Sequence, residues 1–157
     1  MSLSDLRNRI NGFSKLVIIG IGNEMNGDDA AGMFIAKELQ KTINNPKINI
    51  FLGGTTPENL TGPIKKTKPS HILIIDAADF EGEPGETKIL DKDQIEGAGF
   101  STHSFPLSVF VDYLKNETGA EVILLGIQPK RTGAQDGMSK EVKEAVRAII
   151  NLINSFE

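Results

Sequence analysis

Three polar residues of the sequence have the side chains and the positions to carry out chemistry: Asp29, Asp76 and His103. Asp29 follows an aliphatic run and a glycine-rich turn, Asp76 ends a second aliphatic run, and His103 comes shortly before an apolar helical pattern. Two carboxylates and one imidazole, without sulfur, form a ligand set that suits nickel, zinc or cobalt. Because three protein ligands leave coordination positions open for water or substrate, the pattern indicates a catalytic or transient metal site.

Each of these residues also has a purely structural interpretation. Asp28 and Asp29 can cap a helix and interact favourably with its positive end. Asp76 can cap the turn after its strand, and a lone histidine is more often a satisfied or exposed side chain than a ligand. The other histidine, His71, precedes its strand and is therefore expected at the opposite edge of the sheet, so we assign it no role. These patterns alone leave the structural and the functional interpretations open.

The elements that must position these residues alternate between strand and helix. Strands are expected at residues 16–19, 47–52, 71–75, 87–90 and 122–127, and helices at 28–43, at 107–114 and after residue 139. Continuous β-branched strands joined by helices are typical of a largely parallel sheet that helices cover on both faces. Right-handed crossovers bring the carboxyl ends of such strands to one edge, so Asp29, Asp76 and His103 are expected to meet there. The predicted fold class is α/β, a three-layer sandwich.

Length and composition favour one domain over residues 1–157, in which residues 1–14 form an N-terminal arm or a short helix. The net charge of -4 argues against nucleic acid as a partner. No apolar run approaches membrane-spanning length, and the first residues are too polar for a signal peptide, so we expect a cytoplasmic protein without a membrane partner. The lack of cysteine excludes disulfides, thiolate metal sites and a cysteine nucleophile. By default we expect a monomer.

The glycine-rich turn after the first strand is similar to a dinucleotide-binding loop, with glycine at positions 20, 22 and 27. The third glycine does not stand at the expected spacing, and no acidic residue ends the second strand to bind a ribose. We therefore expect no organic cofactor. A nucleotide-binding domain remains a competing hypothesis, and it predicts saturable binding of a nucleotide.

Five motifs follow one another over nearly the whole chain: GIGNEMNGDDAAG, GGTTPEN, ILIIDAADF with PGETKILD, STHSFPLSVFVDYL and VILLGIQPK. In this combination the chain resembles the maturation endopeptidases of nickel–iron hydrogenases, in particular the branch that processes the large subunit of hydrogenase-3-type enzymes. The resemblance implies a twisted, mostly parallel five-stranded sheet between helices. The chain departs from the pattern at Ala30, where many members have glycine.

The resemblance also implies a function. Members of this family remove a short C-terminal peptide from the precursor of a [NiFe] hydrogenase large subunit after nickel insertion, so the precursor is the expected partner and its nickel the expected metal. The metal-contacting residues of the family fall on Asp29, Asp76 and His103. Further residues are expected to line the cleft or to support these ligands: Asp28, Asn23, Gly53, Gly54 and Thr55.

Peptide hydrolysis must proceed here without cysteine and without a serine nucleophile elbow. In one route, the enzyme bridges nickel held by the precursor, the metal polarises the scissile carbonyl or activates a water, and a carboxylate takes the proton. In the other, Asp29 and Asp76 act as a carboxylate pair and the metal only positions the substrate. We favour metal-guided positioning, because it explains a protease that ignores unloaded precursor. A non-catalytic nickel-dependent chaperone is an alternative function. A general metallo-aminopeptidase is a further alternative, but this chain lacks the second set of metal ligands that such an enzyme needs.

Overall fold

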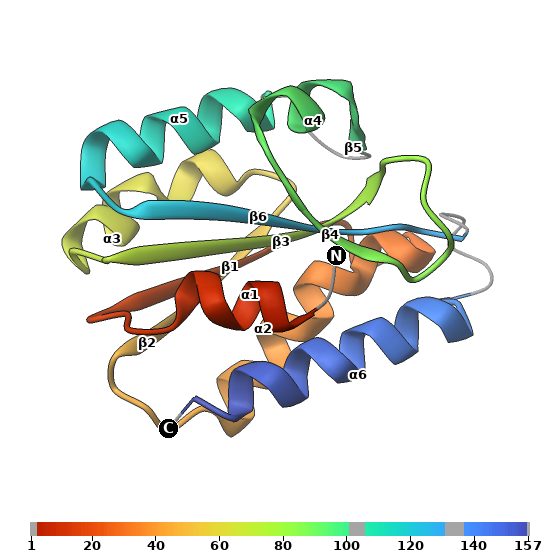
Figure 1. Ribbon diagram of the computed structural model, residues 1–157, viewed down its shortest axis with the longest axis horizontal. Helices are drawn as coiled ribbons and strands as arrows, with labels where there is room; N and C mark the ends of the chain where they lie inside the picture. The colour runs from red at the N-terminus through yellow and green to blue at the C-terminus, as the bar shows by residue number, and fades with distance from the viewer. Residues whose placement is uncertain (1–2, 101–105, 131–136, 157) are drawn as a thin grey trace.

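The computed structural model describes residues 3–100, 106–130 and 137–156, and its strands form one sheet (Figure 1). The order across this sheet is β2-β1-β3-β6-β4, and the neighbours from β2 to β6 are parallel. β4 runs antiparallel to β6, and the two-residue β5 pairs antiparallel with the end of β3. The strands are β1 (Leu16–Ile21), β2 (Ile48–Gly54), β3 (His71–Asp79), β4 (Thr87–Leu90), β5 (Gly99–Phe100) and β6 (Glu121–Ile127).

Helices cover both faces of the sheet (Figure 1). One layer holds α1 (Leu3–Ile10), α2 (Ala31–Thr42) and α6 (Lys140–Asn154), and the other holds α3 (Thr61–Lys66), α4 (Lys92–Gly97) and α5 (Leu107–Thr118). Two short 3-10 helices, η1 (Gly27–Ala30) and η2 (Pro57–Leu60), follow β1 and β2. The prediction of an α/β sandwich around a mostly parallel five-stranded sheet is confirmed. No helix in the described ranges is long and apolar enough to cross a bilayer.

Alternation along the strands supplies one apolar core to each helical layer. In β1, Leu16 and Ile18 belong to the core under α1, α2 and α6, while Val17 and Ile19 belong to the core under α3, α4 and α5. All four side chains are fully buried. Burial of each such side chain stabilises the fold by about 1.5–3 kcal/mol. The central strands, and with them the positions of their carboxyl ends, are therefore well fixed.

α2 lies very close to the sheet because its second residue is glycine. A Cβ added to Gly32 would lie 2.3 Å from the carbonyl oxygen of Ile75 in β3 and 2.4 Å from that of Ile21 in β1. A side chain at this position would therefore push α2 away from both strands. Since α2 continues directly from η1, this contact also fixes where the aspartates of η1 lie.

The main differences from the prediction concern β3, the helix expected over residues 28–43, and α4. β3 does not end before Asp76 but continues to Asp79, because β6 pairs with Asp76 and Ala77 and β5 pairs with the last two residues. The helix expected over residues 28–43 divides into η1 and α2. The sequence analysis does not include α4, which Asp91 caps by accepting a 2.9 Å hydrogen bond from the backbone N–H of Gln94. Asp76 thus lies inside a strand rather than after it.

Candidate active site

The carboxyl edge of the sheet brings together the segments that carry Asp29 and Asp76. Gly22 follows β1 with a φ of 140°, a backbone conformation that favours glycine. A Cβ added to Gly22 would lie 2.0 Å from the carbonyl oxygen of Asp29 and 3.7 Å from Oδ1 of Asp76. The main chain of Asp29 and the side chain of Asp76 therefore lie against the same glycine.

Asp29 lies in η1 and is only 1% exposed. Its Oδ2 accepts a 2.6 Å hydrogen bond from Nδ2 of Asn26, the residue that precedes η1. The sequence analysis missed Asn26, although it stands three residues before Asp29 in the glycine-rich turn. The next residue, Ala30, has a φ of -78° and a ψ of -8°, which is a helical conformation. Ala30 therefore keeps the helical backbone that this turn needs.

Asp76 is fully buried within β3. It pairs with Gly126 of β6, whereas the ladder between β1 and β3 ends one residue earlier, at Gly20 and Ile75. Asp76 therefore lies at the level where the chain turns from β1 towards η1. Burial of a carboxylate is costly unless donors or cations compensate for it, so two such residues at one edge point to a specific polar function.

Asp28 lies in the first turn of η1, whose N-cap residue is Asn26, and its described hydrogen bonds lead to other segments of the chain. It is fully buried, and its carboxylate accepts hydrogen bonds from the backbone N–H of Lys130 (2.8 Å), the backbone N–H of Ser139 (2.6 Å) and the hydroxyl of Ser139 (2.9 Å). Ser139 in turn caps α6 by accepting a bond from the N–H of Val142. Asp28 thus ties η1 to the segments after β6 and before α6, and this holds its neighbour Asp29 in place.

The strand predicted at residues 47–52 continues as β2 to Gly54, so Gly53 and Gly54 end a strand, and this end lies beside the turn that follows β1. The N–H of Gly22 donates a 2.9 Å hydrogen bond to the carbonyl oxygen of Gly54. Gly53 is buried and closely packed, since a Cβ there would lie 3.0 Å from the carbonyl oxygen of Gly20, and Thr55 is exposed. The end of β2 therefore contacts Gly22, the same residue against which Asp29 and Asp76 lie.

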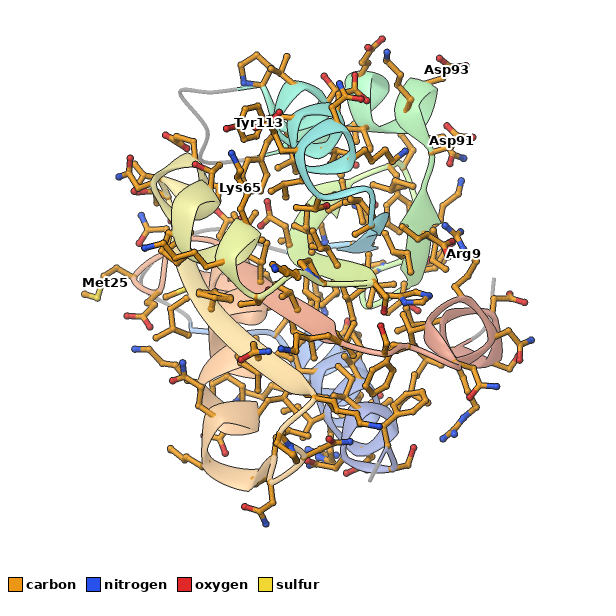
Figure 2. All side chains as sticks on the ribbon, turned by 90° about the vertical axis from the view of Figure 1, so that its left-hand side faces the viewer. Arg9, Met25, Lys65, Asp91, Asp93 and Tyr113 are labelled. Carbon is orange, nitrogen blue, oxygen red and sulfur yellow. The ribbon has the colours of Figure 1, made fainter. Side chains whose placement is uncertain are left out.

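Asn23 shapes the loop that leads to η1. Its Oδ1 accepts a 2.9 Å hydrogen bond from the N–H of Met25, and this contact lies within the loop rather than on Asp29. The side chain of Met25 is 77% exposed and points away from the body of the protein (Figure 2). Asn23 therefore supports the conformation of the site loop.

The third predicted ligand, His103, lies outside the described residues. Among the residues that are described, no group of three or more His, Cys, Asp and Glu side chains is arranged to hold a metal ion. The carboxyl edge thus brings Asp29 and Asp76 together, and the contribution of His103 stays a prediction.

A family model described as "Hydrogenase maturation protease" matches residues 33–155 of the chain. The chain belongs to the hydrogenase maturation protease family. The hydrogenase 3 maturation protease of Escherichia coli K12 is 39% identical over 144 residues, which cover 90% of each chain. A relative from Methanocaldococcus jannaschii that is named for the same family is 42% identical over 94% of this chain and 91% of its own.

Solved structures agree with this assignment. The crystal structure of a [NiFe] hydrogenase maturation protease from Thermococcus kodakarensis is similar to the present one with a TM-score of 0.87 and 36% sequence identity, over 96% of this chain and 97% of that one. An Escherichia coli member with a structure in solution is named an endopeptidase. The predicted family, fold and peptidase class are therefore confirmed.

In this hydrogenase maturation protease, Gln128 organises the segment that follows β3. Its side chain is buried, and its Oε1 accepts hydrogen bonds of 2.9 Å from the N–H groups of Phe80 and Gly82, while its Nε2 donates to Oδ1 of Asp79. The pKa of Asp79 lies below its usual value, chiefly because its carboxylate accepts a bond from the N–H of Glu81 and further because of Gln128. Sequence reasoning missed Gln128, because its partners lie more than 45 residues earlier in the chain.

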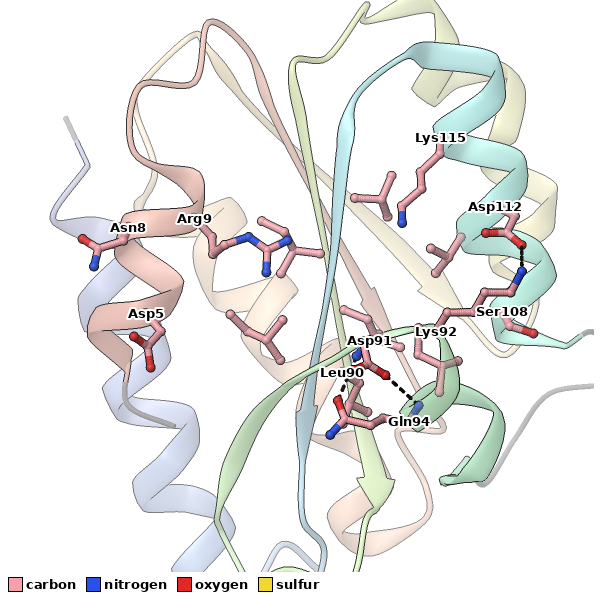
Figure 3. Close-up of a pocket in the computed structure, with 16 residues that line it drawn as sticks. Asp5, Asn8, Arg9, Leu90, Asp91, Lys92, Gln94, Ser108, Asp112 and Lys115 are labelled. Carbon is pink, nitrogen blue, oxygen red and sulfur yellow. Dashed lines mark hydrogen bonds and ion pairs between the residues drawn. The ribbon is translucent and has the colours of Figure 1, made fainter.

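A cavity of about 530 Å³ lies elsewhere in this protease, between α1 and α5 and beside the first half of β6 (Figure 3). We call it the α1–α5 cavity. Arg9 faces it from α1 and Lys115 from α5, and the Lys92–Asp112 ion pair lies at its border. Neither Asp29 nor Asp76 lines it. The volume of a cavity is therefore a poor guide to the active site here, and we assign the site from the buried carboxylates.

Proposed function

We propose that this protease removes a short C-terminal peptide from the nickel-loaded precursor of a [NiFe] hydrogenase large subunit, acting as a monomer in the cytoplasm. Family membership supports the reaction, because relatives that cover most of the chain are named as hydrogenase maturation proteases. The observation that carries the proposal is that two buried aspartates meet at one glycine of the carboxyl edge, where Gly22 lies against the main chain of Asp29 and the side chain of Asp76.

In this proposal the nickel belongs to the substrate. Nickel accepts oxygen and nitrogen ligands, and Asp29 and Asp76 offer carboxylate oxygens to it. His103 is the proposed third contact, on the strength of the family resemblance alone. The hydrogen bond from Asn26 orients Asp29 for this contact. An unloaded precursor lacks the cation that buried carboxylates attract, so it binds less well and escapes cleavage.

The remaining chemistry needs a fixed substrate and a proton acceptor. The contacts to nickel hold the precursor so that its scissile carbonyl lies beside Asp29 and Asp76. One of these carboxylates takes a proton from the attacking water, and the new bond forms between the water oxygen and the carbonyl carbon. The proton then passes to the nitrogen of the leaving peptide as the C–N bond breaks.

The intact mass of a large-subunit precursor tests this function. The precursor is incubated with the enzyme in a nickel-loaded and in an unloaded form. We expect the loss of one C-terminal peptide from the loaded form alone. Cleavage of both forms would keep the endopeptidase but remove nickel from its recognition, and binding without any cleavage would favour the chaperone alternative.

A further inference from the structure

A groove with an apolar floor runs between α2 and α6, outside the site described above. Its volume is about 390 Å³. Phe34 of α2, which is 47% exposed, faces Met138, Val146 and Ile150 across it. We call this feature the α2–α6 groove. An exposed aromatic ring beside an accessible methionine is typical of surfaces that bind another protein.

The α2–α6 groove lies next to the candidate active site. α2 begins two residues after Asp29, and Phe34 lies in the first turns of that helix. At the other wall, Met138 directly precedes Ser139, whose N–H and hydroxyl donate hydrogen bonds to Asp28. A molecule with one segment in the groove is therefore well placed to reach the carboxyl edge of the sheet with another.

Two cations at the border of the groove have no acidic partner within the described part of the chain. They are Lys143 and Arg147, which stand four residues apart and so on one side of α6. The acid on the opposite wall, Glu38, pairs instead with Lys41 at 3.1 Å.

Two other lysines near this region are paired with acids. Lys37 pairs with Glu24, and Lys130 pairs with Glu141 at 2.8 Å. The groove therefore has an apolar floor and two cations at its border without an ion-pair partner in the described ranges, on a protein whose net charge is -4. Its chemistry complements a segment that is apolar on one side and acidic on the other.

We propose that the α2–α6 groove docks an apolar, acidic segment of the hydrogenase large-subunit precursor, an inference that rests on the proposed function. A protease that makes one cut in a large folded protein needs binding contacts away from the scissile bond to select and orient it. Phe34 is the central apolar anchor, and Lys143 and Arg147 steer the acidic side of the segment.

The test uses the full-length enzyme and the full-length nickel-loaded precursor. Lys143→Glu/Arg147→Glu reverses both charges at exposed positions. The matched control, Lys47→Glu/Lys66→Glu, changes the net charge equally at exposed lysines that precede β2 and end α3, at the amino ends of the strands. We expect KM and the Kd for the precursor to rise about tenfold in the groove variant, with kcat unchanged and the control equal to wild type. The rise should shrink at high salt.

Phe34→Ser is a second variant, from the other helix, which tests the apolar anchor if the charge reversal disturbs folding. An unchanged Kd and KM in folded groove variants, with cleavage intact, would overturn the docking proposal and leave the proposed function standing. If wild type binds but does not cleave, the proposed function fails, while the Kd values still decide the docking. If wild type self-associates through the groove and the Kd for precursor does not change, the occupant is a second copy of the chain and the proposal is wrong.

Discussion

The carboxyl edge of the sheet and the α1–α5 cavity both contain several charged residues, but these residues are buried at the edge and exposed at the cavity. At the carboxyl edge, Asp28, Asp29 and Asp76 are each at most 1% exposed. At the α1–α5 cavity, exposed charges form ion pairs, between Arg9 and Glu121 at 2.6 Å and between Lys92 and Asp112 at 3.2 Å. An exposed ion pair contributes roughly 0.2–1 kcal/mol to stability. A buried carboxylate is strongly destabilising unless donors or cations compensate for its lost hydration. Buried charge therefore distinguishes the candidate site better than open volume does.

The largest expected effect comes from neutralising the buried carboxylates. Asp29→Asn and Asp76→Asn keep the shape of the side chain but remove its charge and its capacity to accept a proton. Processing of the loaded precursor should fall by about a thousandfold in each variant. Asp112→Asn at the border of the α1–α5 cavity is the matched control and should process at the wild-type rate. Intact mass measures the processing rates, and circular dichroism checks that each variant folds. Equal rates in the three variants would show that the buried carboxylates matter no more than an exposed acid at the cavity.

Replacing a glycine by alanine should lower the free energy of unfolding at the carboxyl edge but not beside the α1–α5 cavity. Gly32→Ala places a methyl group against the carbonyl oxygens of Ile21 and Ile75, so it should lower the free energy of unfolding by about 3 kcal/mol. At Gly97, on α4 beside the cavity, an added Cβ meets nothing within 4 Å. Gly97→Ala should be neutral or stabilise by about 0.5 kcal/mol. Urea unfolding of both variants measures the difference, and equal values would show that α2 can shift without cost.

Replacing one acidic residue by alanine should lower the free energy of unfolding more at the carboxyl edge than beside the α1–α5 cavity. Asp28→Ala leaves the N–H groups of Lys130 and Ser139 without their acceptor, so we expect a loss of about 2 kcal/mol in the free energy of unfolding. Asp91→Ala removes only the cap of α4 and should cost about 1 kcal/mol. Thermal unfolding, supported by urea titration, compares them. A smaller loss for Asp28→Ala would mean that its bonds do not hold η1 to α6.

The smallest expected effect concerns acid stability. The folded protein lowers the pKa of Asp79 from its ordinary 3.8, mainly through the hydrogen bond from the N–H of Glu81. The unfolded chain then binds the proton more readily. The stabilisation is therefore complete above the ordinary pKa and is lost as the pH falls through the lower, folded value. Asp79→Asn should make stability less sensitive to pH below about 4. Identical acid unfolding curves for variant and wild type would contradict this.

Much of the fold can be predicted from the sequence, because the residues that are buried in each strand also form a recognisable apolar run along the chain. The central strands are apolar on both faces, and this produces continuous aliphatic runs that predict a parallel sheet. The position of Asp29 and Asp76 at one edge follows from the topology of such sheets. The cap of α4 was also predictable, since Asp91 and Gln94 have the spacing of a capping box.

The contacts that complete the site were not predictable in this way. Asp28 bonds to Ser139 over 111 positions, and no local pattern distinguishes this contact from a helix cap. The end of β3 at Asp79 depends on pairing with β5 and β6, which again is decided by distant residues. The sequence therefore indicates which residues matter, while the folded chain is needed to assign what each of them touches.

The central claim is that Asp29 and Asp76 contact nickel carried by the precursor. The most direct test is nickel X-ray absorption spectroscopy of the loaded precursor, alone and mixed with enzyme and frozen before turnover. With wild type we expect added carboxylate oxygen ligands at the nickel, and with Asp29→Asn/Asp76→Asn we expect these oxygens to be missing, so that only the nitrogen of His103 adds to the ligands of the precursor. A nickel spectrum that wild-type enzyme leaves unchanged, in a complex shown to have formed, would contradict the account.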